Sequence, residues 1–468
     1  MAGTMSVSGL ISGMSTDEVI SKLMEVERQP LTTLNKKKTN LNNKADAWRQ
    51  LNLKLYALKD AAYALQSIDM FRSRTVNVSD QSVVTATASS GALTSNYNIT
   101  VQKLAKSQSL TSDAMTSADT ALNLTGTFQI NGKDITLTAE DTLQSLAEKI
   151  NRTDDIKVMA SIVQVSANEY RLTLTSRETG TSNNIQFTDG LNTEDGSSLL
   201  QFLGILDGAG QVKNETQAAQ DAVFTVNGLQ ITKSSNTVDD VITGVTLTLK
   251  RETSGSVVEL NVSEDKDKIV NATKTFVEKY NDVMKLINEY TSYSYDKDTK
   301  KTTTGILFGD STVTYIQSQL KQFLSTSISG VDQSVSLLSL VGISTGSGVE
   351  AAKTGLLEFD ETTFRNKLDS NFEDIGKMFG SITGLGDGIF TKINDTINEM
   401  TRTKGLIAIR TDTIQSELKL INESIDTLEA RLERKKEAYY RQFSAMELAL
   451  AKLQSQANYL SSFFTSSG

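Results

Sequence analysis

The C-terminal part of the chain carries one narrow apolar stripe of helical period. Between residues 411 and 460, apolar side chains recur at alternating steps of mostly four and three, which places them on one face of an α-helix. No proline or glycine interrupts this stretch, so it predicts one helix about 70 Å long. Lys435 divides the stripe into a first part, Ile414, Leu418, Ile421, Ile425, Leu428 and Leu432, and a second part, Tyr439, Phe443, Met446, Leu450, Leu453, Ala457 and Leu460. A helix with so narrow an apolar face needs a partner helix.

A second stripe of the same kind lies near the N-terminus. It follows a short helix that Ser15 or Thr16 caps and that Pro30 ends or kinks. Its members are spaced by three and four, with Lys38 filling one place, and are Leu31, Leu34, Leu41, Ala45, Trp48, Leu51, Leu55, Leu58, Ala62 and Leu65. We expect the two long helices to pair or to enter one shared helical tube, with the residues between them as an insertion. The alternative, two unrelated helices on a globular core, is disfavoured because neither stripe is broad enough.

Between the two stripes the apolar period changes to two and later returns to 3.6. Alternating residues rich in Val and Thr predict antiparallel strands, mainly at 74–102, 157–165, 170–175, 245–249 and 257–262. The octapeptide that begins at Phe128 resembles the one that begins at Phe224, and both contain Asn-Gly, the residue pair typical of a two-residue hairpin. Helices are expected at 142–150, 269–287, 313–324, 361–379 and 389–400, a hairpin at 293–304, and a polar loop at 111–126.

These elements predict an α+β chain with four parts. Long terminal coiled-coil helices and a helical leg domain enclose two inserted β-rich head domains, one of which is itself inserted in the other. The parts comprise, in this order, residues 1–40 with 411–468, 41–70 with 264–410, 71–110 with 215–263, and 111–214. The first fifteen residues are rich in Gly, Ser and Met, and we expect them to be disordered in the isolated chain.

Composition removes several classes of function. The net charge is −9, from 47 basic and 56 acidic residues, and no basic face is evident, so we expect no nucleic-acid partner. The chain has no His and no Cys, which excludes His-centred triads and Cys/His metal sites, and we expect no cofactor and no metal. The N-terminus lacks the pattern of a cleavable secretory signal, and no apolar run approaches the roughly 18 residues that span a bilayer, so we expect no membrane insertion.

Two short motifs resemble catalytic sites without completing them. The segment Gly342-Ile343-Ser344-Thr345-Gly346 matches a serine nucleophile elbow, which requires a histidine to accept the serine proton. Ser263 and Lys266 match the S-x-x-K motif of serine acyl-enzymes, but the accompanying S-D-N motif is absent. Ser263 also precedes an acidic helix start, where serine is an ordinary N-cap. The sequence therefore predicts a protein that is not an enzyme.

Both ends and the middle of the chain resemble the flagellar filament cap protein family, also called hook-associated protein 2. The similar segments are Gly9 to Gly13, Leu23 to Glu25, Glu27 to Leu31, Arg441 to Glu447 and Tyr459-Leu460, and the two repeats resemble the flagellin-hook Ile-Asn motif. Met14-Ser15 departs from the family, which often has Leu-Asp there. The resemblance implies a secreted protein at the tip of the flagellum, exported without a cleavable signal. It also implies a cap that promotes the folding and insertion of flagellin and prevents its leakage.

The resemblance further implies the partners. They are other copies of the chain in a closed ring of about five subunits, a pentamer, together with flagellin, the hook-filament junction protein and an export chaperone at the C-terminal helix. We expect the stripes to remain without partners until such molecules arrive. The expected contact residues are Leu41, Trp48, Leu51, Leu55, Leu58, Ile414, Leu418, Ile421, Ile425, Leu428, Leu432, Phe443, Met446, Leu450 and Leu453. The alternatives left open are a filament or hook-filament junction subunit and an adhesin that uses the head domains.

Overall fold

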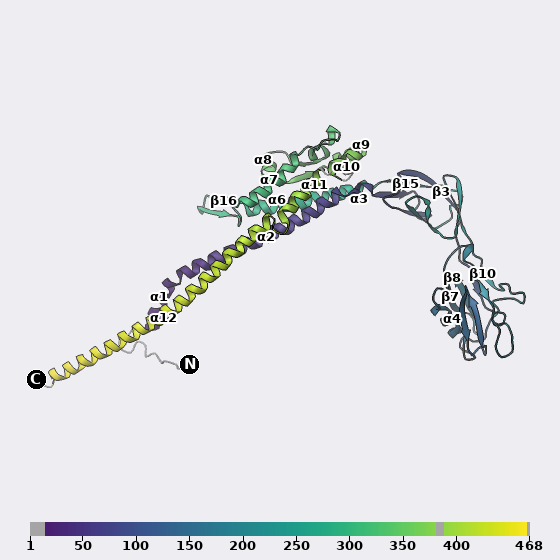
Figure 1. Ribbon diagram of the computed structural model, residues 1–468, viewed down its shortest axis with the longest axis horizontal. Helices are drawn as coiled ribbons and strands as arrows, with labels where there is room; N and C mark the ends of the chain where they lie inside the picture. Colours follow the sequence, from purple (N-terminus) through teal and green to yellow (C-terminus); the bar gives the residue numbers. More distant parts are fainter. Residues whose placement is uncertain (1–14, 381–387, 466–468) are drawn as a thin grey trace. The chain divides into compact units, whose positions relative to one another are not determined.

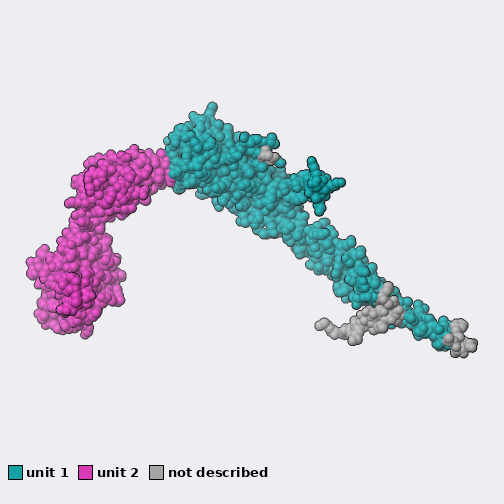
Figure 2. Space-filling model, turned by 180° about the vertical axis from the view of Figure 1, so that it is seen from behind, with its two compact units in different colours: residues 1–70, 266–468 teal, residues 71–265 magenta. Residues whose placement is uncertain are grey.

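The computed structural model describes residues 15–380 and 388–465 of the chain (Figure 1). The chain divides into two compact units, residues 1–70 with 266–468 and residues 71–265 (Figure 2). The first unit is mainly helical and the second is mainly β-sheet, so the expected α+β class with long terminal helices and inserted β-rich segments is confirmed. The expected disorder of the first fifteen residues concerns residues 1–14, which lie outside the described part, and Ser15, which the structure describes as the cap of α1.

The helical unit contains the two predicted long helices. α2 spans Gln29–Gln66 and α12 spans Leu406–Thr465, and both extend beyond their apolar stripes. Domain boundaries at residues 40 and 411 would fall inside these helices and mark no break in them. The other helices are α1 (Thr16–Glu27), α3 (Ile68–Arg72), α6 (Lys266–Tyr290), α7 (Ser311–Gln322), α8 (Val349–Thr354), α9 (Glu361–Ser370), α10 (Phe372–Phe379) and α11 (Ile389–Thr401). Two antiparallel strand pairs also belong to this unit: the predicted hairpin of β16 (Tyr293–Asp296) with β17 (Lys301–Thr304), and β18 (Ile343–Thr345) with β19 (Leu357–Phe359), which are joined through α8.

Local signals set the helix boundaries. The Ser15 side chain caps α1 by accepting from the Glu18 backbone N–H. α1 ends at Glu27, and Arg28 is the junction between α1 and α2. Pro30 lies in the first turn of α2, where its missing N–H costs no intrahelical bond, so it marks the beginning of a helix. The single helix expected over residues 361–379 is wrong, because Asn371 leaves the helical conformation and separates α9 from α10.

The core of the helical unit lies around α2, which packs against α6, α11 and α12. Trp48, Leu51, Leu55 and Leu58 of α2 have no exposed surface. Three aromatic rings from three helices extend this core: Phe390 lies 4.7 Å from Phe276 and 4.6 Å from Phe379 between centroids, each pair edge to face. α2 is therefore the central helix of this unit.

The β unit contains four antiparallel sheets. Their strand orders are β1-β15-β3-β11-β12, β13-β14-β2, β10-β4-β8-β7 and β6-β5-β9. The strands are β1 (Arg74–Val78), β2 (Val84–Ala88), β3 (Ser95–Lys103), β4 (Ser109–Thr111), β5 (Gly126–Ile130), β6 (Lys133–Leu137), β7 (Val158–Ser166), β8 (Glu169–Ser176), β9 (Phe187–Thr188), β10 (Glu215–Gln217), β11 (Ala222–Val226), β12 (Leu229–Lys233), β13 (Thr237–Ile242), β14 (Val245–Leu249) and β15 (Val258–Glu264), with helices α4 (Leu143–Arg152) and α5 (Leu199–Phe202).

Two separate apolar clusters form the cores of this unit. One contains only residues between Leu110 and Val212, and the other joins Val76–Ala105 to Ala222–Val262. β3 lies between β15 and β11 in one sheet, so residues before and after the first cluster share a sheet. These clusters support our proposal of two head modules, 71–110 with 215–263 and the inserted 111–214. The segment expected to be a polar loop, 111–126, is not polar throughout, because Leu124 is buried in the first cluster.

Both repeats form the predicted hairpins. Asn131-Gly132 joins β5 to β6 and Asn227-Gly228 joins β11 to β12, and all four residues have positive φ, as a type I′ turn requires. Each asparagine also exchanges a pair of hydrogen bonds with a neighbouring segment through its backbone N–H and its side-chain Oδ1. The partner is Gln186 for the first turn and Asn98 for the second.

Candidate assembly surface

The first part of the C-terminal stripe is covered by the chain itself. Ile414 is 3 % exposed, and Ile425 and Leu432 are each 7 % exposed, because α12 packs on α2, α1 and α11. Leu418, Ile421 and Leu428 are half-buried. The expectation that the stripes lack partners in the single chain is therefore wrong for this part. It is also wrong for Trp48, Leu51, Leu55 and Leu58, which lie in the core, while Leu41 is half-buried.

α1 runs antiparallel to α12 and covers the middle of the stripe. Ile20 and Met24 form an apolar cluster with Leu432, against which Leu31, Leu428, Tyr439, Tyr440 and Phe443 pack. The N-terminal end of α1 is held by the Tyr440 hydroxyl, which donates to the Asp17 carboxylate over 3.0 Å. The expected contact residues did not include Ile20 and Met24, although their spacing of four was visible in the sequence.

Lys435, which interrupts the stripe, has a partner on α1. Its ammonium donates to the Glu27 carboxylate, and the two side chains are about one-third exposed, 36 % and 31 %. The hydrogen bond from Lys435 and its positive charge hold the pKa of Glu27 below its ordinary value. A cation therefore occupies a position of the apolar stripe without being left unpaired, because the facing helix supplies a carboxylate.

From Met446 onwards, the second part of the stripe lies mostly on the surface. Met446 is 38 % exposed, Leu453 61 % and Leu460 56 %, while Leu450 is half-buried. Figure 1 shows the C-terminal part of α12, in yellow, continuing beyond α1. Among residues 15–380 and 388–465, no helix covers these side chains. We call Met446, Leu450, Leu453 and Leu460 the distal seam.

The distal seam has the properties of an association surface. A helical segment of this length is only marginally stable in water without tertiary packing. Apolar side chains spaced by three and four residues form the holes into which the side chains of a partner helix insert. The exposed aliphatic side chains therefore make this end of α12 a candidate site for contact with another protein chain.

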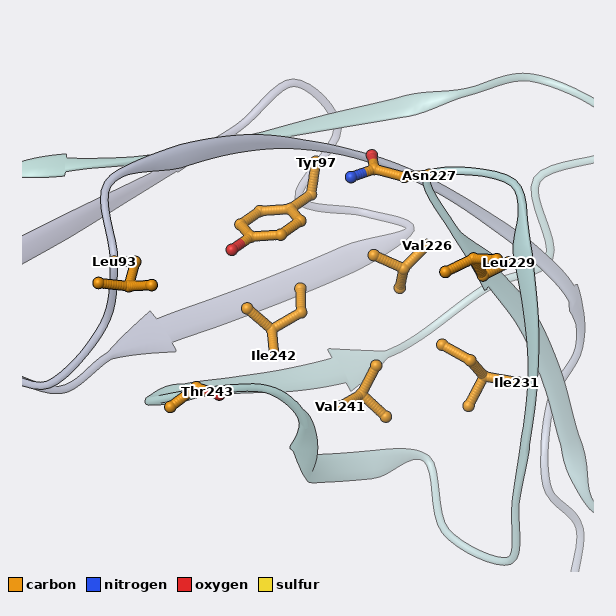
Figure 3. A pocket seen from close by; sticks show the side chains of 9 residues that line it. All are labelled: Leu93, Tyr97, Val226, Asn227, Leu229, Ile231, Val241, Ile242 and Thr243. Atoms are coloured by element: carbon orange, nitrogen blue, oxygen red, sulfur yellow. The ribbon is translucent and has the colours of Figure 1, made fainter.

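An apolar pocket of about 330 Å³ lies in the β unit beside the second Asn-Gly turn (Figure 3). Val226 and Ile242 form its floor and are nearly buried, whereas Leu93 and Leu229 at its rim are each 73 % exposed. Its other lining residues are Tyr97, Asn227, Ile231, Val241 and Thr243. The pocket offers few polar groups, and nothing in the sequence marked it in advance.

The two motifs that resembled catalytic sites are not assembled into one. Ser344 lies on the short strand β18, and the chain contains no histidine that could activate it. The Lys266 ammonium is held by the Asp369 carboxylate at 2.6 Å. Within the described residues, no group of three or more acidic side chains could hold a metal ion, and no helix is long and apolar enough to cross a membrane.

Three family models match the chain. The C-terminal model of flagellar hook-associated protein 2 matches residues 219–455, which is half of the chain, and the N-terminal model matches residues 12–108. The flagellin hook IN motif matches residues 122–178, which include the first Asn-Gly turn. The models therefore match all three regions on which the resemblance rested.

Relatives in other bacteria match the chain over nearly its whole length. It is 29 % identical to flagellar hook-associated protein 2 of Escherichia coli, over 98 % of both chains. It is 27 % identical to the A-type protein of Pseudomonas aeruginosa, over 97 % of this chain and 96 % of the relative. A crystal structure of three domains of the Escherichia coli flagellar cap protein FliD aligns with a TM-score of 0.62 and 29 % identity, over 79 % of this chain and 99 % of that one. The chain thus belongs to the flagellar hook-associated protein 2 family, the structural proteins that cap the flagellar filament at its extracellular tip.

Proposed function

We propose that copies of this chain join into a closed ring at the filament tip and that the distal seam is the part of each copy that contacts its neighbours and flagellin. The observation that carries the proposal is the exposure of Met446, Leu453 and Leu460 in an apolar stripe whose earlier members Ile414, Ile425 and Leu432 are buried. Through this contact the ring promotes the folding and insertion of flagellin and prevents its leakage.

The position of the seam suits a contact that must form repeatedly. α12 is held by α1 and α2 up to the level of Phe443, so its end is presented from a stable base. The apolar stripe is one residue wide and accepts partner helices without a large matching surface. A closed ring needs a heterologous interface, in which two different surfaces of each copy meet.

The other proposed partners use the same end of the molecule. An export chaperone that binds the C-terminal helix in a groove would cover the apolar side chains of the distal seam before assembly. The hook-filament junction protein is the surface on which the first ring would sit. The proposed order is therefore chaperone, junction protein and then flagellin, each in contact with the end of α12.

The test uses two aspartate substitutions, Met446→Asp with Leu453→Asp, in the full chain. Because both side chains are exposed, we expect the unfolding of the single chain to be unchanged. Charges in the seam oppose burial in an interface, so we expect loss of ring assembly in electron micrographs and loss of filament growth. Ser455→Asp is the matched control, because it adds the same group to the opposite face of the helix.

Two results would overturn the proposal. One is normal ring formation and filament growth by the double variant. The other is equal loss of assembly in Ser455→Asp, which would mean that charge anywhere on the helix is harmful. Truncation at residue 411 is a poorer test, because it also removes Ile414, Ile425 and Leu432, which are buried against the rest of the helical unit.

A further inference from the structure

The two Asn-Gly turns hold their asparagine side chains differently. The carboxamide of Asn131 is fixed at both ends: Oδ1 accepts from the Gln186 N–H at 2.9 Å, and Nδ2 donates to the Ile156 carbonyl at 2.8 Å. The carboxamide of Asn227 is fixed at one end only, where Oδ1 accepts from the Asn98 N–H at 2.8 Å. Within the described residues, Nδ2 of Asn227 donates to no acceptor.

The strands that follow the two turns are also supported differently. β6 lies beneath α4, from which the Lys149 ammonium donates to the Thr136 carbonyl at 2.9 Å, and its side chains Ile135 and Leu137 are each 2 % exposed. β12 and β6 are both edge strands of their sheets, but β12 contains no fully buried side chain and begins with Leu229, which is 73 % exposed. A hairpin end with few buried contacts opens locally at lower free energy.

We propose that Asn227 is a site of spontaneous deamidation and that Asn131, in the equivalent turn, is protected. The backbone nitrogen of Gly228, after losing its proton, attacks Cγ of Asn227. The new N–Cγ bond closes a succinimide, and the Cγ–Nδ2 bond breaks to release ammonia. Water then opens the succinimide: cleavage of the N–Cγ bond leaves aspartate, and cleavage of the bond from that nitrogen to the Asn227 backbone carbonyl carbon leaves isoaspartate.

Opening of the turn sets the rate. Asn227 has a φ of 51°, which is a left-handed conformation. It must leave that conformation before the backbone nitrogen of Gly228 can reach Cγ of Asn227. Gly228 has no side chain to obstruct the attack, and no heavy atom beyond its two chain neighbours lies within 4 Å of the place where a Cβ would stand. The single tether of the Asn227 side chain and the exposure of β12 make this opening easier than at Asn131.

The products alter the rim of the apolar pocket. An aspartate at position 227 still accepts from the Asn98 N–H but adds a carboxylate beside Tyr97 and Leu229. Isoaspartate lengthens the backbone by one carbon, so the paired bonds between position 227 and Asn98 are no longer both possible. The modification therefore marks the age of a chain and loosens the junction of β11 with β3.

The test follows deamidation of the full-length protein by mass spectrometry of its peptides, at neutral and at mildly alkaline pH. We expect Asn227 to react about tenfold faster than Asn131, the ratio that about 1.4 kcal/mol in opening free energy gives. The rate should rise with pH because the attacking nitrogen is deprotonated. Gly228→Ala, which hinders the attack, should slow the reaction at Asn227 and leave Asn131 unchanged.

A second measurement keeps the test decisive if Gly228→Ala disturbs the turn, since alanine is strained at positive φ. Hydrogen exchange of the Asn227 amide should be faster than that of the Asn131 amide in the unaltered protein. Equal deamidation at the two turns, faster reaction at Asn131, or no reaction at either would each overturn the proposal. Slower exchange at Asn227 than at Asn131 would also overturn it.

Discussion

The two parts of the stripe on α12 have the same spacing and different surroundings. Ile414, Ile425 and Leu432 are nearly buried, while Leu453 and Leu460 are more than half exposed. The difference arises because α2 and α1 accompany α12 only to about Phe443. A repeating apolar pattern thus shows that a helix has a partner, but the extent of the neighbouring helices decides whether the partner is the same chain or another one.

The largest effect is expected at α2, on which the covered part of α12 packs. Leu58→Ala removes a fully buried side chain and should lower the free energy of unfolding of the helical unit by about 3–4 kcal/mol. Trp48 is the only tryptophan of the chain and lies in this unit, so its fluorescence in urea reports the transition. Leu53→Ala on the same helix, where the side chain is 57 % exposed, should change it by less than about 0.5 kcal/mol. Equal losses in the two variants would mean that α2 is not central to the core.

A smaller effect is expected within the covered part of α12. Ile425→Ala should cost about 2 kcal/mol, because the side chain is 7 % exposed and lies near the edge of the core. Leu453→Ala, in the distal seam, should leave the unfolding of the single chain unchanged and weaken the ring. Urea unfolding and ring formation, measured on both variants, separate the two parts. The comparison fails if Leu453→Ala destabilises the single chain as much as Ile425→Ala does.

The smallest effect is expected from pH at the contact between α1 and α12. The pKa of Glu27 is lowered in the folded chain, mainly by the hydrogen bond from Lys435, so this carboxylate stabilises the fold above its unfolded pKa. That contribution is lost as the pH falls below about 4. The protection of α1 against hydrogen exchange, taken relative to the intrinsic exchange rate at each pH, should therefore decrease on acidification, and less so in Glu27→Gln.

Glu25→Gln is the control for this pH effect, because Glu25 is an exposed neighbour on the same helix. It should keep the acid response of the unaltered chain. If Glu25→Gln and Glu27→Gln reduced the response equally, the effect would come from the general charge of α1 and not from the pair with Lys435.

Patterns within one segment predicted most of the fold. The three-and-four spacing placed α2 and α12, and Asn-Gly placed both hairpins, because left-handed conformations suit Asn and Gly. The family was likewise visible in motifs at both ends and in the middle, and the comparisons confirm it. The break at Asn371 was missed because the apolar period continues across it.

The candidate site was only partly predictable, because burial depends on contacts between distant segments. Trp48 and Leu58 pack in the core that α2 forms with α6 and α11. Their spacing along the sequence would be the same if α2 packed against another chain, so the spacing does not identify the partner. The sequence shows Lys435 only as an interruption of the stripe. Its partner Glu27 lies about four hundred residues away in sequence, so the pair could not be predicted from the local pattern. The expected role of Phe443, Met446, Leu450 and Leu453 in contacts with other chains stays a proposal.

Hydrogen exchange along α12, in the single chain and in the assembled ring, is the most direct test of the proposed association surface. We predict that the amides around Ile414 to Leu432 are protected in both states, because the chain itself covers them. Those around Met446 to Leu460 should exchange rapidly in the single chain and become protected in the ring. Strong protection of the distal seam in the single chain, or no change there on assembly, would contradict the proposal.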